Sequence, residues 1–177
     1  CGGEALAQAE VQGAVIDGAA IVAASTPPGR SSQALVRVSG SGILGPFRGL
    51  LLRSEGQPGS GVTLEAGTLE RVRIPIGAVT VPAIAIPYQA PRSSTGEDVL
   101  ELLVPGGERL LDRIVTALIE LLDSAAVAAR RAWPGEFTAR AYLAGRIDLL
   151  AAEGVAAAIA ARSDGELEAA QGLMRGS

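Results

Sequence analysis

Short segments in which apolar and polar residues alternate restrict the fold of this chain more than any other feature. Two of them, at 33–39 and 68–74, are separated by stretches rich in Gly, Pro and Ser. A period of two places the apolar side chains on one face of a strand, so each segment is predicted to be a half-buried β-strand. Residues 18–25, 81–86 and 98–104 are three further strand candidates, and Pro82 predicts that the second of these lies near a sheet edge.

Between and after these strands, the spacing of apolar residues changes to that of a helix. Residues 110–122 carry a stripe at three- and four-residue intervals, which predicts a helix packed on the core: Leu110, Leu111, Ile114, Val115, Leu118, Leu121 and Leu122. A short helix is expected around 46–52, and 125–131 is predicted to be a further strand. Strands with interleaved helices and Gly/Pro turns indicate the α+β class.

Residues 133–149 are predicted to form a corner between two helices. Pro134-Gly135 is typical of a turn, because Pro presets one backbone angle and Gly tolerates the other. Thr138 is predicted to cap a short helix that Gly145 ends in the left-handed conformation, and Asp148 to cap one long helix over 149–172. The corner would then present four ionisable side chains: Glu136, Arg140, Arg146 and Asp148.

The composition excludes several kinds of chemistry. All fifteen basic residues are arginine, and the 177 residues include no Lys, His or Asn. The chain therefore has no Ser-His or Cys-His pair, no imidazole metal ligand, no lysine for a Schiff base and no P-loop lysine. The single Cys excludes an internal disulfide. We predict no catalytic residue and no metal site.

The net charge argues against sequence-independent binding of nucleic acid. The net charge is −4, the isoelectric point is near 4.9 and only 3% of residues are aromatic. Affinity for the phosphate backbone needs clustered cations, and stacking on bases needs aromatic rings. No uninterrupted apolar stretch is long enough for a membrane span, so no membrane partner is expected.

Two charged residues stand at unusual places in the predicted strands. Glu101 lies in mid-strand with apolar residues on both sides, and Arg37 shares a strand face with Leu35 and Ser39. Burial of an unpaired charge is costly, so each residue needs a partner or solvent. Glu101 either faces outward on a half-solvated sheet or belongs to a binding site. Arg37 is either an edge arginine whose head reaches solvent or a member of such a site.

Four stretches, in this order, together resemble one family, the tRNA wobble-uridine modification GTPases called MnmE or TrmE. They are Ile-Val-Ala-Ala-Ser-Thr-Pro-Pro-Gly-Arg at 21–30 with Leu-Val-Arg-Val-Ser-Gly at 35–40, Ser-Thr-Gly-Glu-Asp-Val-Leu-Glu at 94–101 with Gly-Gly at 106–107, Pro-Gly-Glu-Phe-Thr-Ala-Arg-Ala-Tyr-Leu-Ala-Gly-Arg-Ile-Asp-Leu at 134–149, and Ala-Glu-Gly-Val at 152–155 with Ile-Ala-Ala-Arg-Ser at 159–163. The similarity runs from about residue 21 to the end of the chain.

The resemblance implies an α+β N-terminal domain with a mixed sheet and packed helices, followed by the first long helix of an all-α domain. We expect a flexible leader at 1–17, a folate-binding and dimerisation domain at 18–147 and the start of a truncated helical domain at 148–177. The implied cofactor is 5-formyltetrahydrofolate or methylenetetrahydrofolate. GTP, K⁺ and Mg²⁺ belong to the family's GTP-binding domain, which this chain lacks, so no GTPase activity of its own is expected.

The same resemblance implies partners and a location. The expected assembly is a homodimer that works with a flavoprotein of the MnmG or GidA type in the full-length protein and meets tRNA only indirectly. The expected location is the cytoplasm. Two other functions stay open: a degenerate scaffold that only dimerises, and, ranked last, a free-standing folate-dependent one-carbon transferase.

The family's folate contacts carry over to three residues: Arg37, Glu101 and Arg146. A pterin presents an amino group beside a ring N–H, and one carboxylate such as Glu101 accepts from both in a planar fork. The arginines can donate to the pterin carbonyl, to the one-carbon group or to the glutamate tail. Glu97 and Asp98 are instead expected to cap their own loop.

The chain departs from the family pattern at several positions. Arg146 stands where Lys is common, Pro105 where His precedes the Gly pair, Ser31-Ser32 where Gly is usual, and Trp133 where Arg is usual. These substitutions bear on ligand affinity more than on the fold.

Overall fold

The computed structural model describes residues 17–26, 31–53 and 62–175. The predicted leader, apart from Asp17, and residues 27–30 of the first family-like stretch lie outside this part. The chain divides into two compact units. We call the unit made of 18–93 and 97–132 the sheet unit, and the unit made of 94–96 and the residues from 133 onward the helical unit. The predicted boundary at 147/148 stays a prediction.

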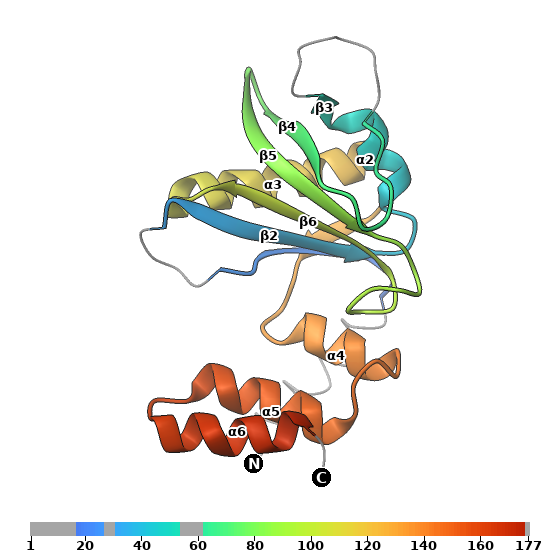
Figure 1. Cartoon of the computed structure of the whole chain (residues 1–177). Coiled ribbons are helices and arrows are strands. Elements are labelled where there is room, and N and C mark those ends of the chain that lie inside the picture. Colours follow the sequence, from blue (N-terminus) through green and yellow to red (C-terminus); the bar gives the residue numbers. More distant parts are fainter. Residues whose placement is uncertain (1–16, 27–30, 54–61, 176–177) are drawn as a thin grey trace, which may run out of the picture. The chain divides into compact units, whose positions relative to one another are not determined.

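In the described part of the sheet unit, seven strands form one sheet in the order β3-β4-β5-β6-β2-β1-β7 (Figure 1). Neighbouring strands are antiparallel except β1 and β7, which are parallel, so the sheet is mixed. The expected α+β class with a mixed sheet is confirmed. The strands are β1 (Ala20–Ala24), β2 (Gln33–Gly40), β3 (Leu52–Arg53), β4 (Glu70–Ile76), β5 (Val79–Tyr88), β6 (Asp98–Pro105) and β7 (Ala129–Arg131).

Helices α2 (Leu44–Leu50) and α3 (Glu108–Ser124) pack on one face of this sheet (Figure 1). The predicted stripe of α3 supplies Ile114, Leu118 and Leu122 to the core, each fully withdrawn from solvent. They meet the alternate residues of the central strands, including Val36 and Leu102. The residues between these alternate positions point to the opposite face, where no described helix of the sheet unit packs.

The prediction that the strand around Pro82 lies at a sheet edge is wrong, because β5 pairs with β4 on one side and with β6 on the other. The physical rule behind the prediction nevertheless holds locally. The pairing of β5 with β6 begins only at Ile84, opposite Leu103. Continuing that register would place Pro82 opposite Pro105, and neither proline has an N–H to donate to the ladder.

The helical unit contains α4 (Glu136–Leu143), α5 (Leu149–Ala160) and α6 (Asp164–Arg175). The prediction of one helix over 149–172 is wrong, because α5 and α6 form a packed pair of helices. Two hydrogen bonds fix the break between the helices. Ser163 Oγ accepts from the Glu166 N–H at 3.3 Å, and Glu166 Oε2 accepts from the Arg162 N–H at 2.7 Å. This exchange resembles a capping box and starts a new helix.

The corner before α5 is partly as predicted. Asp148 caps α5 by accepting from the Ala151 N–H at 2.7 Å, which confirms the predicted cap. Gly145 has φ of 65° after the end of α4, as expected for a left-handed helix end. Thr138 is not a cap, because α4 begins at Glu136 after Gly135, whose φ is 78°. None of the helices in the described residues is both long and apolar enough to cross a bilayer.

Candidate functional site

Arg37 and Glu101 form an ion pair across the centre of the sheet. Their Cα positions are direct partners on the neighbouring strands β2 and β6. Glu101 Oε1 accepts from Arg37 Nε at 2.9 Å and from Nη2 at 2.6 Å. The side chains are 28% and 15% exposed, respectively. The two residues that looked unusual in the sequence are therefore each other's partner.

The pair lies on the sheet face opposite α3. Val36 and Leu100, which precede the two charged residues, are buried in the core, and alternation turns Arg37 and Glu101 the other way. Ile86 of β5 lies directly opposite Glu101 on its other side, so the carboxylate has an apolar neighbour as well as a cation. Glu101 Oε2 accepts no hydrogen bond from any described residue and is available to a ligand.

Two carboxylates hold the loop before β6: Asp98 caps its own loop, as predicted, whereas Glu97 bonds instead to a residue of β2. Asp98 Oδ1 accepts from the Ala90 N–H at 2.9 Å. Glu97 Oε2 accepts from the hydroxyl of Ser39, a fully buried residue, at 2.9 Å. Ser93 Oγ donates to the Glu97 carbonyl oxygen. These bonds tie the start of β6, and so the strand that carries Glu101, to the end of β2.

Arg146 belongs to the helical unit, where the end of α4 fixes its backbone. The Arg146 N–H donates to the Ala141 carbonyl at 2.8 Å, and the Gly145 N–H donates to the Tyr142 carbonyl at 2.9 Å. This is the pattern of a Schellman motif, which satisfies the last carbonyls of a helix. The Arg146 Cγ lies 4.0 Å from the place where a Cβ on Gly96 would stand, so its stem packs on the 94–96 loop of the same unit.

Glu136 and Arg140 have a different role from the one predicted. We expected the corner to present both side chains, but Glu136 is 0% and Arg140 5% exposed. Glu136 Oε1 accepts from Arg140 Nη2 at 3.1 Å, and its Oε2 accepts from the Trp133 N–H at 2.8 Å. The carboxylate thus joins the turn to the first turns of α4 and is a structural group.

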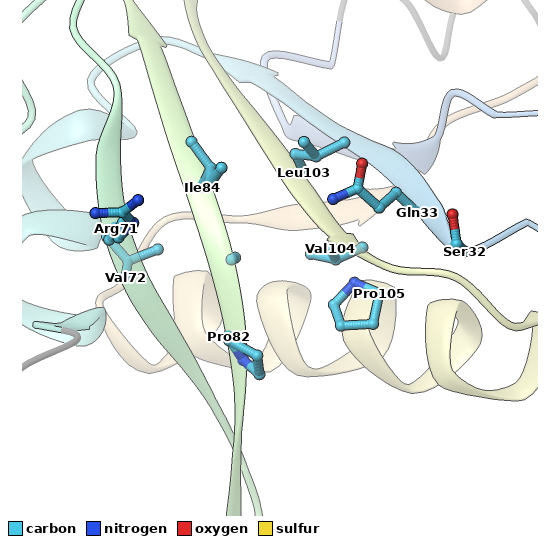
Figure 2. A pocket seen from close by; sticks show the side chains of 10 residues that line it. Ser32, Gln33, Arg71, Val72, Pro82, Ile84, Leu103, Val104 and Pro105 are labelled. Carbon is cyan, nitrogen blue, oxygen red and sulfur yellow. The ribbon is translucent and has the colours of Figure 1, made fainter.

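A pocket of about 280 Å³ opens where β5 and β6 separate (Figure 2). We call it the fork pocket. Pro82 and Pro105, which cannot pair, lie at its open end, and Ile84 and Leu103, the last paired residues, lie at its closed end. The remaining lining residues are Ser32, Gln33, Arg71, Val72, Ala83 and Val104.

Comparison with known proteins identifies the family of this chain. A family model described as the GTP-binding protein TrmE N-terminus matches residues 20–146. Similar proteins include the tRNA modification GTPase MnmE of Azoarcus sp. strain BH72, 42% identical over 77% of this chain and 27% of its own length. MnmE of Alkalilimnicola ehrlichii is 40% identical over 89% of this chain and 32% of its own length. The chain belongs to the TrmE N-terminal family.

This finding confirms the resemblance drawn from the four stretches of sequence. The chain spans about a third or less of the length of these relatives, so it corresponds to the N-terminal part of a tRNA modification GTPase. MnmE of Halorhodospira halophila, 40% identical, matches over 91% of this chain and 32% of its own length.

Two departures from the TrmE pattern lie next to each other in the structure. The Gly106 N–H, directly after Pro105, donates to the Ser32 carbonyl at 3.0 Å, and Ser32 and Pro105 both line the fork pocket. Neither this pocket nor Arg71 in its wall was predicted from the sequence. Two facing prolines are a usable signal only when the strand register is known, and the register is a long-range property.

The described residues contain no group of three or more His, Cys, Asp or Glu side chains arranged to hold a metal ion. The chemistry available at the sheet face is therefore that of a carboxylate, guanidinium groups and apolar side chains. Such a set binds and orients a polar ligand by charge-assisted hydrogen bonds.

Proposed function

We propose that this chain is the tetrahydrofolate-binding and dimerisation module of a tRNA wobble-uridine modification GTPase. The observation that supports folate binding is the Arg37–Glu101 pair, with bonds of 2.6 and 2.9 Å on a sheet face that no described helix of the sheet unit covers. The proposed ligand is 5-formyltetrahydrofolate or methylenetetrahydrofolate. The proposed location of the whole protein is the cytoplasm.

Glu101 suits the edge of a pterin because of how Arg37 holds it. Both bonds from Arg37 end on Oε1, so Oε2 stays open to a ligand donor. The pterin amino group or the adjacent ring N–H then donates to Oε2, and a planar fork to both oxygens forms when Arg37 releases one of its two bonds to Oε1. Arg37 offsets the negative charge of this carboxylate through two charge-assisted hydrogen bonds.

Arg146 is the third proposed contact. Its backbone is fixed by the Schellman motif after α4. Its guanidinium can donate to a carbonyl, a formyl oxygen or a carboxylate, and the planar group loses less side-chain entropy per hydrogen bond than a lysine does. It keeps the charge of the usual lysine but presents it as a planar group.

The rest of the proposed activity lies outside this chain. GTP, K⁺ and Mg²⁺ would bind to the GTP-binding domain of a full-length protein, and a flavoprotein of the MnmG type would join the one-carbon unit to tRNA. The proposed role of this chain is to bind the one-carbon donor and to form the homodimer. No GTPase activity of its own is proposed for the chain, which has no lysine for a P-loop.

Calorimetric titration with 5-formyltetrahydrofolate, with light scattering on the same sample, tests both parts of the proposal. We expect a dimer that binds the folate, and we expect Glu101→Ala to weaken binding by about 1.5–3 kcal/mol, roughly tenfold to a hundredfold. Glu120→Ala is the matched control, because Glu120 is an exposed carboxylate on α3. Its affinity should equal that of the wild type.

Two results would contradict the proposal in different ways. A folded Glu101→Ala variant with unchanged folate affinity would remove Glu101 from the site. A wild-type dimer without saturable binding would instead favour the scaffold function. In that case, restoring Gly at Ser31 and Ser32 and His at Pro105 tests whether those substitutions abolished the site.

A further inference from the structure

The fork pocket and the Arg37–Glu101 pair share one face of the sheet. Glu101 and Leu103 are two residues apart on β6, and alternation turns both side chains to the same side. On β2, Arg37 and Gln33 are four residues apart and are related in the same way. The pocket therefore begins about 7 Å along β6 from the carboxylate, as judged from the rise per residue of a strand.

A continuous row of apolar side chains crosses this face beside the pair. Leu35, Leu103 and Ile84 are direct partners on β2, β6 and β5. The row ends on β4 with Arg71, the direct partner of Ile84. Figure 2 shows three of these side chains in this order, Arg71, Ile84 and Leu103, with Gln33 beyond Leu103.

Arg71 is the only ionisable residue among the described residues that line the fork pocket. It is exposed and makes no hydrogen bond or ion pair with any described residue. The side-chain amide of Gln33 likewise has no partner in the described part of the chain. The pocket thus offers an apolar floor with one available cation and one available amide.

We propose that the fork pocket binds the p-aminobenzoyl-glutamate tail of a folate whose pterin ring lies at Arg37 and Glu101. This inference rests on the proposed function. A folate has a polar ring, an aromatic middle and an acidic end, and the face offers in the same order a carboxylate with a cation, the apolar row, and Arg71. The tail carboxylate pairs with Arg71, and Gln33 donates to an amide or carboxylate oxygen.

The prolines argue against an added peptide strand in the same place. A strand that entered the fork would gain affinity from backbone hydrogen bonds to β5 and β6. Pro82 and Pro105 have no N–H to offer, so the fork cannot bind a strand as an ordinary sheet edge does. A small ligand held by side chains needs no such donors.

Two ligands, titrated into the 177-residue chain, separate the ring from the tail. 5-Formyltetrahydrofolate has both parts, whereas 6-methyltetrahydropterin keeps a reduced ring without the p-aminobenzoyl-glutamate. We expect Arg71→Ala to weaken the folate about three- to tenfold and to leave the pterin unchanged, because Arg71 contacts only the tail and is partly screened by solvent. Arg71→Lys keeps the charge and should retain most of the affinity.

Arg113→Ala serves as the matched control, because Arg113 is an exposed arginine on α3 and lines no pocket described above. It should bind both ligands as the wild type does. Binding of both ligands with no effect of Arg71→Ala, or with an equal effect on both, would overturn the tail assignment and leave the ring site standing. Failure of the wild type to bind either ligand would overturn the proposed function and the tail assignment together.

Discussion

Glu136 and Arg140 lie one helical turn apart on α4, and both side chains are nearly or fully withdrawn from solvent. Attraction within such a pair roughly offsets the cost of removing two charges from water, whereas a single charge left behind is strongly unfavourable. The pair therefore makes the unit sensitive to the loss of either member.

Glu136→Ala is expected to lower the free energy of unfolding by about 3–5 kcal/mol, because Arg140 would remain buried without its carboxylate. Urea unfolding followed by circular dichroism measures the change. Glu153→Ala, which removes an exposed carboxylate from α5, should stay within about 0.5 kcal/mol of the wild type.

The double variant Glu136→Leu/Arg140→Met tests the cause. It should be less destabilised than Glu136→Ala, because it leaves no isolated charge in the interior. Equal destabilisation of both variants would show that the lost hydrogen bond from the Trp133 N–H, and not the loss of the carboxylate beside Arg140, carries the effect.

For single residues, the sequence indicated which charged side chains are unusual, but it indicated less well which groups surround them. Arg37 and Glu101 were recognisable because charges in alternating strands need a partner, but their pairing depends on a register between strands 64 positions apart. The Glu-to-Arg spacing in α4 predicts an ion pair from the sequence, while its burial depends on what packs against the helix. Arg71 had no local signal at all.

Among the secondary structure elements, the junction of β6 and α3 is the tightest. A Cβ on Gly106 would lie 1.9 Å from the carbonyl oxygen of Ser31 and 2.7 Å from its carbonyl carbon. Both are backbone atoms, so no side-chain rotation relieves the clash. Glycine at 106 lets the loop before β2 lie directly against the end of β6.

Gly106→Ala is therefore expected to destabilise the protein by about 1–3 kcal/mol, the usual range for overpacking. Thermal or urea unfolding measures it. Gly49→Ala is the matched control, because Gly49 lies in α2 and a Cβ there would meet no atom within 4 Å. That variant should be unchanged or more stable by up to about 1 kcal/mol. Equal loss in both variants would contradict the proposed clash.

Elements with a strong local pattern were predicted well, and their ends and neighbours less so. The stripe at 110–122 and the alternation at 33–39 correspond to α3 and β2. The division of 149–172 into two helices was missed, although Ser163 and Glu166 have capping-box spacing, because the Ala-rich composition favours helix throughout. The prediction of a sheet edge at Pro82 was wrong because β5 lies between β4 and β6. It lacks pairing with β6 only at the end that carries Pro82.

For the whole molecule, the charge predicts a division of labour in the full-length protein. With a net charge of −4 and no lysine, the chain offers few cations for counterion release from nucleic acid. At about 150 mM salt we expect its dissociation constant for tRNA to be weaker than about 100 µM. Fluorescence polarisation with labelled tRNA measures this, and saturable micromolar binding would assign a direct tRNA contact to this part of the protein.

The class of fold and the family were accessible from the sequence because strand alternation, helix periodicity and four ordered motifs agree. The order of the strands in the sheet could not be predicted from the sequence, because β1 pairs with β7, which lies more than a hundred residues away along the chain. The fork pocket depends on that global arrangement, so only the structure reveals it.

The facing prolines also bear on how this sheet limits edge-to-edge pairing with strands of other molecules. A split in a sheet normally exposes two unpaired strand edges, which invite strands of other molecules and so promote aggregation. At Pro82 and Pro105 the missing donors make both sides of the split poor templates. The sheet can therefore stay open between β5 and β6 without offering an added strand the donors it would need.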